Sequence, residues 1–491
     1  MTLVIEIAGT RLLAPLFGNS LHTWTALIGV VLVAMSIGDY LGGLLVDRAP
    51  RLSLLGYLLL AASGWTLLVP VLYAGLRGAT ANAGLISGPL LTSLVLFAVP
   101  ACLLAAVGPF IVRLLSRTSE DHEIGLSAGL VGMVSTLGSF AGTLFTGFYL
   151  LPECGVRAIF LLTGLLAGVL GIAVLLWCRV NSSLAPVAAL AAVAVAGVAN
   201  LSRAPKPPAS LIHEEQTFYH DLRVEESTTE YGDPIRTLHL DTTLEGGQYV
   251  ETGGIAITCQ LYWRLAEVYC PRLENALFLG GGGFTTAEDF SRRHPGARSE
   301  VCEIDPAVIE VGRRYFRLND FPQVTATASD ARRFLSNGTT KYDFIFGDAF
   351  QGVRNIPSHL ITQEFFGLAK ARLTDDGIFL MNIISPVRGE HATLLHSILR
   401  TLRTQFPFTQ VYAVRPDRPT EPNNVIVLGA AREPRVQERP AATEEATQFL
   451  LSTRLPDGLH EPRGAMVLTD DHNPAEWMIA RQLMACPSVN P

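Results

Sequence analysis

The sequence predicts two parts of different fold class: an N-terminal, all-α membrane domain with several spans and a C-terminal α/β domain. The 491 residues are too many for one ordinary domain. Only 16% of them are charged, against about 25% in soluble domains, and residues 1–201 are almost wholly apolar. In residues 210–491, strand and helix patterns alternate, which is typical of a parallel sheet. The expected parts are a multi-span membrane domain (1–202), a linker (203–210), a small β region (211–255) and the α/β domain (256–485).

Six apolar stretches are long enough to cross a bilayer, which needs about 20 residues. The last of them is the weakest, because it is short, rich in alanine and interrupted by Pro186. Residues 1–17 look like a truncated or re-entrant helix, because no basic region or cleavage site marks a signal peptide. The six expected spans lie near 21–46, 52–76, 90–115, 124–150, 157–178 and 183–201.

Small residues spaced four apart predict close packing between membrane helices. The pairs are Gly38 with Gly42, Gly125 with Gly129, and Gly138 with Gly142. Asp39 lies inside an apolar stretch, where a charge is costly and indicates function. The alternative is that Asp39 lies near the membrane interface and pairs with an arginine.

Charge and cysteine content narrow the classes of partner. A net charge of −7 argues against nucleic acid. The seven cysteines are scattered without a CxxC spacing, so neither a metal site nor a disulfide framework is indicated.

A proline-rich linker and a small β region precede the α/β domain. The linker, RAPKPPAS at 203–210, is expected to be stiff. Polar and apolar residues alternate in 220–226 and 236–241, which predicts a β-hairpin that could cover one face of a binding site. Residues 256–269 are expected to form a helix.

Beyond Asn275 the pattern predicts a mainly parallel sheet with helices on both faces. Ligands of such sheets bind at the carboxyl ends of the strands. The expected strands are 276–280, 299–303, 324–328, 342–347, 377–383, 409–414 and 424–429. The expected helices are 284–293, 306–317, 331–337, 363–373 and 391–405.

Four glycines, Gly280 to Gly283, follow the first of these strands, and Glu303 ends the second about 20 residues later. Glycines let the backbone approach a ligand closely, and an acid at this distance can hold two ribose hydroxyls. The order of strand, glycine turn, helix, strand and acid therefore predicts a Rossmann-like nucleoside site. The alternative is a tight turn that only lets a helix pack on the sheet.

Three further acids follow strand ends. Asp305 precedes Pro306, and this pair is typical of a helix start, so Asp305 is expected to be structural. Asp330 caps the helix that follows it, contacts adenine, or does both. Asp348 has no obvious helix after it and is a candidate general base.

Together these segments resemble the spermidine synthase family, the polyamine aminopropyltransferases, over about residues 213–480. The resemblance implies a Rossmann-like, methyltransferase-type sheet in the C-terminal domain. Other segments resemble the branch of this family that is fused to a transporter-like membrane domain. The family-like motifs are GGGGFT (280–285), CEID (302–305), SDA (329–331) and YDFIFGD (342–348). The branch-like segments are EIAGTRLLAPLFGNS (6–20), PSHLITQEFF (357–366) and LTDDHNPAEW (468–477).

The implied reaction transfers an aminopropyl group from decarboxylated S-adenosylmethionine to an amine such as putrescine and releases methylthioadenosine. Asp348 is then the base that takes a proton from the amine. Glu303 holds the ribose and Asp330 the adenine amino group. The donor-binding residues implied by the resemblance are Gly280, Gly281, Gly282, Glu303, Asp330 and Ala331. The donor is a co-substrate, and no tightly bound cofactor or metal is expected.

Four positions depart from the family pattern. The acid that meets the donor's amino tail is replaced by Gly283, and the second acid of the amine-binding pair by Gln351. A family glutamine is replaced by His220, and a family tyrosine by Cys259. Losing the acid at 283 makes intact S-adenosylmethionine a plausible alternative donor. Candidate contacts to the acceptor or donor are His220, Gln248, Gly283 and Gln351.

Three functions stay open at this level: an aminopropyltransferase, a transferase that uses intact S-adenosylmethionine on another acceptor, and a non-catalytic sensor or transporter of such ligands. The expected partners are a small-molecule amine, an adenosyl donor and the lipid bilayer, with a homodimer left open. Arginines at 48, 51, 113, 117 and 179 would share the cytoplasmic side of the cell (inner) membrane. The segment 42–51, GGLLVDRAPR, is similar to the cytoplasmic loop of major-facilitator transporters. Six spans would place the soluble domain outside, whereas the donor is made in the cytoplasm. We expect a cytoplasmic domain, which requires that one apolar stretch, most easily 183–201, does not span.

Overall fold

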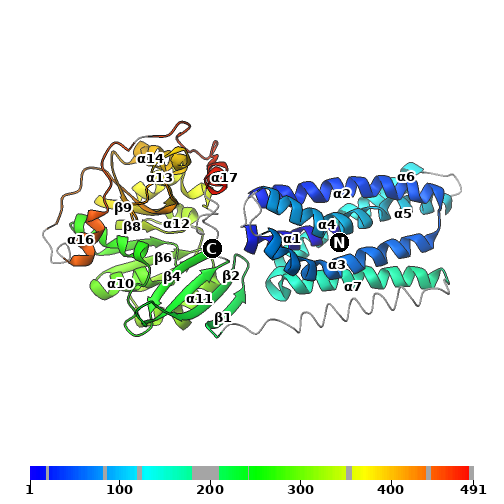
Figure 1. Ribbon diagram of the computed structural model, residues 1–491, viewed down its shortest axis with the longest axis horizontal. Helices are drawn as coiled ribbons and strands as arrows, with labels where there is room; N and C mark the ends of the chain where they lie inside the picture. The colour runs from blue at the N-terminus through cyan, green and yellow to red at the C-terminus, as the bar shows by residue number, and fades with distance from the viewer. Residues whose placement is uncertain are drawn as a thin grey trace. The chain divides into compact units, whose positions relative to one another are not determined.

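The chain divides into two compact units, Met1–Pro207 and Pro208–Pro491, which are taken separately (Figure 1). The computed structural model describes most of each unit, whereas the last expected span, 183–201, lies outside the described residues. The described residues are 1–17, 21–80, 86–118, 124–179, 209–241, 243–349, 356–437, 444–459 and 461–485.

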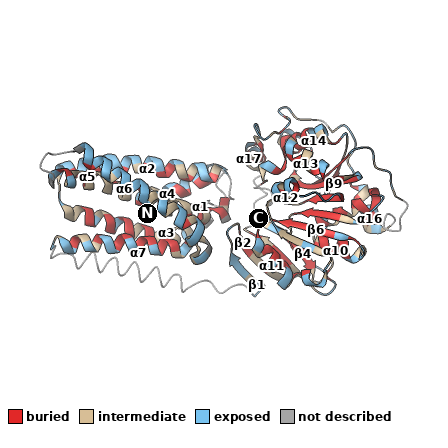
Figure 2. Ribbon diagram, turned by 180° about the vertical axis from the view of Figure 1, so that it is seen from behind, coloured by how far each residue is buried: buried red, intermediate tan, exposed pale blue. Residues whose placement is uncertain are grey.

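The N-terminal unit is helical, and within its described residues five helical stretches are long and apolar enough to cross a membrane. These five agree with the first five expected spans. Large apolar side chains such as Leu32, Val33 and Phe148 point outward, which suits contact with lipid (exposed residues in Figure 2). The helices are α1 (Thr2–Phe17), α2 (Leu21–Arg48), α3 (Leu52–Thr80), α4 (Ser87–Ala105), α5 (Val107–Thr118), α6 (Ile124–Phe145) with a π-helical turn (Thr146–Leu150), and α7 (Leu151–Trp177). The candidate spans are Leu21–Arg48, Leu52–Leu76, Ser87–Arg117, Gly125–Leu150 and Glu153–Trp177.

The predicted glycine packing is confirmed in α2 and is wrong for most of α6. A Cβ at Gly38 would lie 2.1 Å from the Cys102 carbonyl oxygen, and one at Gly42 would lie 2.6 Å from that of Ala106. The backbones of α2 and α4 therefore touch. At Gly125, Gly129 and Gly138 a Cβ would meet no described atom within 4 Å, because α6 lies at the edge of its unit.

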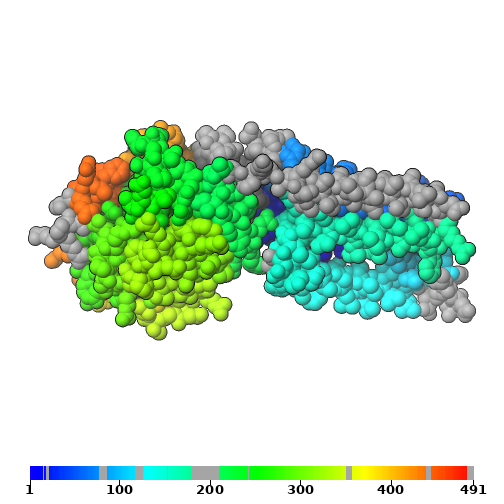
Figure 3. All heavy atoms as spheres, turned by 90° about the horizontal axis from the view of Figure 1, so that it is seen from below, coloured from blue at the N-terminus to red at the C-terminus, as the bar shows by residue number. Residues whose placement is uncertain are grey.

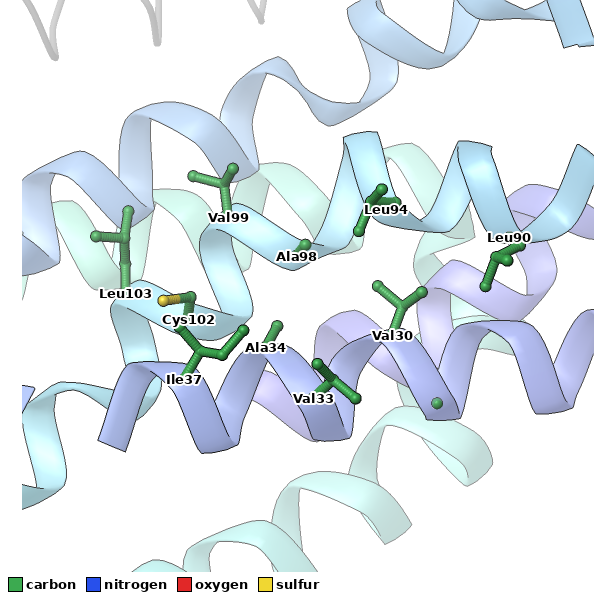
Figure 4. A pocket seen from close by; sticks show the side chains of 11 residues that line it. Val30, Val33, Ala34, Ile37, Leu90, Leu94, Ala98, Val99, Cys102 and Leu103 are labelled. Carbon is green, nitrogen blue, oxygen red and sulfur yellow. The ribbon is translucent and has the colours of Figure 1, made fainter. Parts of the chain in front are cut away.

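Two cavities differ in what they could bind. One, of about 440 Å³, lies between α2, α5 and α6 and is lined by Asp39, Asp47 and Arg113. Within the described residues the ion pair here joins Arg113 to Asp47 at 3.6 Å, so the arginine pairing expected of Asp39 belongs to Asp47. The other, of about 570 Å³, is lined by apolar side chains and Cys102 of α2 and α4, and no charged residue lines it (Figure 4).

Replacing Gly38 by alanine should destabilise the N-terminal unit, because the new methyl group would overlap a backbone carbonyl that cannot rotate away. Overpacking of this kind costs about 1–3 kcal/mol. Thermal unfolding of the full chain in detergent measures the effect. Gly29→Ala is the matched control on the same helix, since a Cβ there meets no described atom within 4 Å. Equal stability of the two variants would contradict the α2–α4 contact.

The C-terminal unit begins with a four-stranded antiparallel sheet in the order β1-β2-β3-β4. The predicted hairpin is the β2–β3 pair and is confirmed. The two outer strands, β1 and β4, are not predicted from the sequence. Polar and apolar residues do not alternate clearly in either of them, and β4 contains Gly246-Gly247. The predicted helix 256–269 is shorter than expected, and its first half is a 3-10 helix. The elements are β1 (Leu211–Gln216), β2 (Asp221–Thr228), β3 (Pro234–Leu240), β4 (Thr243–Tyr249), the 3-10 helix η2 (Thr258–Arg264) and α9 (Leu265–Tyr269).

A seven-stranded sheet follows, in the order β10-β11-β9-β8-β5-β6-β7, and β11 runs antiparallel to both its neighbours. All seven predicted strands and five predicted helices are present within a few residues, and α16 and α17 are additional. The strands are β5 (Asn275–Leu279), β6 (Arg298–Glu303), β7 (Val324–Ala328), β8 (Tyr342–Gly347), β9 (Leu373–Ser385), β10 (Phe408–Ala413) and β11 (Asn423–Ala430). The helices are α10 (Thr285–Arg293), α11 (Pro306–Tyr315), α12 (Ala331–Asn337), α13 (Gln363–Ala371), α14 (Thr393–Gln405), α16 (Glu445–Ser452) and α17 (Ala475–Ala485).

Each face of this sheet has its own apolar core, as expected for a sheet covered on both sides (Figures 1 and 2). Successive residues of β8 alternate between the two cores: Phe344 and Phe346 face α10 and α11, and Ile345 faces α13 and α14. Burying each such side chain contributes about 1.5–3 kcal/mol. The four-stranded sheet closes over the first face, where the Arg236 guanidinium donates to the Tyr315 carbonyl oxygen at the end of α11 (compare the adjoining green and yellow-green surfaces in Figure 3).

The topology places a switch point beside β5. This strand lies between β6 and β8, so the chain leaves β5 toward one side of the sheet and returns on the other. Loops that follow two such strands diverge, and ligands of open α/β sheets bind in the gap between them. The glycine turn follows β5 and Asp348 follows β8, so both lie at this point.

Candidate active site

The glycine turn contacts the loop that carries Asp348. Gly280 has φ +101° and Gly282 has φ +47°, conformations that favour glycine. A Cβ at Gly280 would lie 2.3 Å from the Asp348 carbonyl oxygen. The Asp348 N–H donates to the Leu279 carbonyl oxygen at 2.8 Å, so this loop is held against the end of β5. Glycine at 280 is therefore a steric requirement of the site.

Glu303 anchors the same turn from the other side. Its Oε2 accepts the Gly281 N–H at 2.7 Å, and its Oε1 accepts the Asp305 N–H at 2.9 Å. Glu303 thus already has two backbone partners. A carboxylate has about four acceptor sites, so two remain for a ribose diol. Burial raises the pKa of Glu303, and the two N–H groups oppose that shift.

Asp348 is held by a residue that sequence analysis missed. The side-chain nitrogen of Asn382, on β9, donates to Asp348 Oδ1 at 2.9 Å and to Asn424 Oδ1 at 3.1 Å. Burial raises the pKa of Asp348 to about 6, and the Asn382 bond opposes the rise. A carboxyl with this pKa is largely ionised at pH 7 and can still accept a proton. The sequence did contain a signal for Asn382: it is an asparagine within the apolar run 379–384 of β9, and it is buried.

The two capping expectations are confirmed. Asp305 accepts the Ala307 N–H at 2.9 Å and starts α11 with Pro306. Asp330 accepts the Arg333 N–H at 2.9 Å and starts α12. Its second oxygen lies 2.7 Å from His359 Nε2, so both oxygens have a partner.

These partners affect what Asp330 can contribute. Burial alone would raise its pKa, but the Arg333 N–H and His359 outweigh burial and hold the pKa below its usual value. Asp330 is therefore an anion at neutral pH, and Ala331 lies buried beside it. The adenine contact expected of both residues stays a prediction.

Position 283 is tightly packed. A Cβ on Gly283 would lie 3.0 Å from the Phe316 ring, which is fully buried. On its other side, a Cβ at Gly246 of β4 would lie 2.3 Å from the Gly283 nitrogen. Gly283 thus lies in a crowded position between β4 and Phe316.

Strand β4 brings a further carboxylate, Glu245, to the turn. A Cβ at Gly282 would lie 2.8 Å from the Glu245 carbonyl oxygen. Glu245 Oε1 is inaccessible to solvent and has no hydrogen-bond partner among the described residues. Sequence analysis did not select Glu245, because nothing in the β4 segment distinguishes it from an exposed strand residue.

Of the remaining candidates, the structure describes His220 and Gln248 but not Gln351. Their contacts to a ligand stay predictions. His220 is buried, with Nδ1 3.4 Å from Asp241 Oδ2. The Gln248 amide donates to Glu288 Oε2 at 2.8 Å and to the Gly253 carbonyl oxygen at 3.3 Å, which ties β4 to α10. Gln351 lies outside the described residues.

Cys259 of η2 completes the group around Asp348. It is buried, and burial, with smaller effects from Asp348 and Glu245, raises the pKa of its thiol far above the usual value. The thiol is therefore neutral and is no nucleophile at pH 7. Within the described residues, His, Cys, Asp and Glu nowhere form a group of three that could hold a metal ion.

The sequence of the C-terminal unit matches a known domain family. The spermine/spermidine synthase domain matches residues 264–438. These residues form a spermine/spermidine synthase domain. The match includes the glycine turn, Glu303, Asp330 and Asp348, and leaves out the four-stranded sheet with Glu245.

Individual relatives agree. The polyamine aminopropyltransferase of Vibrio vulnificus is 27% identical over 187 residues, covering 36% of this chain and 60% of that protein. The probable polyamine aminopropyl transferase of Bifidobacterium longum is 26% identical over 285 residues, covering 54% of this chain and 62% of that protein. The chain thus spans about three fifths of the length of these relatives. A probable spermidine synthase from Corynebacterium glutamicum aligns in structure with a TM-score of 0.44 and 20% identity, covering 54% of this chain and 97% of that one.

Gly280→Ala should destabilise the C-terminal unit by about 1–3 kcal/mol, the cost of forcing a disfavoured backbone conformation. The methyl group would also push the Asp348 loop away from β5. Gly296→Ala is the matched control, because a Cβ there meets no described atom within 4 Å. Denaturant unfolding of the full chain, followed by near-ultraviolet circular dichroism, compares the two. A Gly280→Ala protein as stable as the control would show that the turn does not require glycine.

Proposed function

We propose that the chain is a membrane-anchored aminopropyltransferase-like enzyme. It transfers an aminopropyl group from decarboxylated S-adenosylmethionine to an amine, putrescine being the expected acceptor, and releases methylthioadenosine. The observation that carries this proposal is Asp348: a carboxyl with a pKa near 6, in contact with a nucleoside-type glycine turn. The spermine/spermidine synthase domain match supports the reaction class.

The chemistry requires little from the protein beyond positioning and proton removal. The amine nitrogen attacks the carbon next to the sulfonium, the new C–N bond forms, and the C–S bond breaks with its electron pair going to sulfur. An alkylamine with a pKa of about 10.4 is almost fully protonated at pH 7, and freeing its lone pair costs about 4.6 kcal/mol. Asp348 accepts the proton that the ammonium loses, and Asn382 holds the carboxylate toward it.

The donor would lie across the glycine turn. In this proposal Glu303 uses its two remaining acceptor sites for the ribose hydroxyls, and Asp330 with Ala331 contacts the adenine. The turn lets the donor approach the backbone at Gly280 to Gly282.

A second function is favoured by one observation, the absence of an acid at position 283. An acid there would repel the carboxylate of intact S-adenosylmethionine, and Gly283 removes that repulsion. The alternative is therefore a transferase that uses intact S-adenosylmethionine on another acceptor. Its product would be adenosylhomocysteine instead of methylthioadenosine.

We also propose that the N-terminal unit anchors the enzyme in the cell membrane with its C-terminal unit in the cytoplasm. The five candidate spans end at Trp177, next to Arg179. With the arginines at 48, 51, 113 and 117 on the cytoplasmic side, an odd number of spans keeps Arg179 on that side too.

Product analysis tests the reaction. The full chain in detergent is incubated with labelled decarboxylated or intact S-adenosylmethionine and a panel of amines. Methylthioadenosine together with an aminopropylated amine is the expected result. Adenosylhomocysteine would support the alternative donor, and ligand binding without any product would overturn both enzyme functions.

Asp348→Asn should lower kcat by about 10²- to 10⁴-fold, because an amide cannot take the proton. Binding of methylthioadenosine should change little. Asp375→Asn, which removes an exposed carboxylate at the start of β9, should keep full activity. An active Asp348→Asn enzyme would remove Asp348 as the base.

The kcat/KM of the wild type should rise with pH through about 6, since the ionised form of Asp348 is the active one. Below that pH the carboxyl is protonated and the rate should fall tenfold per pH unit. A flat profile between pH 5 and pH 7 would contradict this assignment.

A further inference from the structure

Both substrates of the proposed reaction carry a primary ammonium group, yet two acids expected to bind such groups are absent. Position 283 is glycine and position 351 is glutamine. A buried ammonium without an anionic partner is strongly disfavoured. Another carboxylate is therefore required near the reacting atoms.

Glu245 lies where that carboxylate is needed. The glycine turn touches the carbonyl oxygen of Asp348 at position 280 and that of Glu245 at position 282. These two turn positions are two residues apart, so their Cα atoms are separated by at most about 7.6 Å. Strand β4 and the loop after β8 thus flank one short turn.

Two buried acceptor oxygens of this region have no hydrogen-bond donor among the described residues. Glu245 Oε1 and Asn382 Oδ1 are both inaccessible to solvent and have no hydrogen-bond partner among the described residues. Leaving such acceptors unpaired is costly. An ammonium group offers three N–H donors and no acceptor, and it supplies what these oxygens lack.

The electrostatic surroundings agree with the geometry. Burial, and then the nearby carboxylates of Asp348, Glu303 and Asp241, raise the pKa of Glu245 well above its usual value. The Cys259 thiol lies in the same group, and His220 faces Glu303. A cation bound among these carboxylates relieves their mutual repulsion.

We propose that Glu245 binds a primary ammonium group of a substrate beside Asp348 and takes over the role of one of the two missing acids, that of position 283 or that of position 351. This inference rests on the proposed function, and it extends that function to substrate choice. The ammonium belongs either to the aminopropyl tail of the donor or to the acceptor amine. In the first case Glu245 also repels the carboxylate of intact S-adenosylmethionine, so the site selects the decarboxylated donor.

Calorimetric titration of the full chain in detergent tests the role of Glu245. The ligands are methylthioadenosine, which has no ammonium, decarboxylated S-adenosylmethionine, intact S-adenosylmethionine, and putrescine in the presence of methylthioadenosine. The variants are Glu245→Gln, which keeps shape and removes charge, and the control Glu230→Gln at an exposed position of the β2–β3 turn.

Glu245→Gln should bind methylthioadenosine within about twofold of wild type, which also shows that the fold is intact. It should bind one ammonium ligand about 10- to 100-fold more weakly, the value of one charge-assisted hydrogen bond. Weakened binding of decarboxylated S-adenosylmethionine identifies the donor tail, and weakened binding of putrescine identifies the acceptor. In the first case the variant should also lose much of the wild-type preference for decarboxylated over intact S-adenosylmethionine.

The inference is overturned if Glu245→Gln binds both ammonium ligands as wild type does, if it loses methylthioadenosine equally, or if wild type binds neither ammonium ligand. Failure of the proposed function is seen separately, as a wild-type protein that binds these ligands and forms no methylthioadenosine. In that outcome the titrations still decide whether Glu245 holds an ammonium group.

Discussion

The contact between the glycine turn and the backbone of the Asp348 loop is the constraint on which the site depends. Because Gly280 has no side chain, the loop after β8 can lie against the end of β5, and the Asp348 N–H can reach the Leu279 carbonyl oxygen. The same turn gives the Gly281 N–H to Glu303. The segment Leu279–Gly281 thus sets the positions of a candidate base and a candidate ribose ligand. These two residues follow different strands.

Local chemistry made much of this predictable. The strands of the large sheet are apolar runs bounded by polar residues, and Asp305-Pro306 is a helix start that involves only adjacent residues. The residues that sequence analysis missed depend on distant partners. Asn382 acts on Asp348 across the β8–β9 pair, Phe316 fills the space at Gly283 from the end of α11, and Glu245 arrives on a strand with no clear pattern.

The N-terminal unit also shows how far the sequence can predict packing. Small residues spaced four apart occur in both α2 and α6, yet only Gly38 and Gly42 touch another backbone, that of α4. A missing side chain permits close approach, but the rest of the helix surface decides what approaches. The spacing of the glycines correctly predicted that α2 could pack closely against another helix. It did not predict which helix that would be.

In the proposed reaction, the carboxylates around the glycine turn would link substrate binding to activation of the base. Burial raises the pKa of both Asp348 and Glu245, and the neighbouring carboxylates raise that of Glu245 further. A bound ammonium group offsets the repulsion between these carboxylates and so promotes ionisation of both carboxyls. Ligand binding and loss of the carboxyl protons are linked equilibria. A ligand that stabilises the ionised carboxylates therefore also binds more tightly once they are ionised. A neutral or anionic ligand would gain nothing from this arrangement, which is why the charge distribution favours an amine substrate over the other ligand classes.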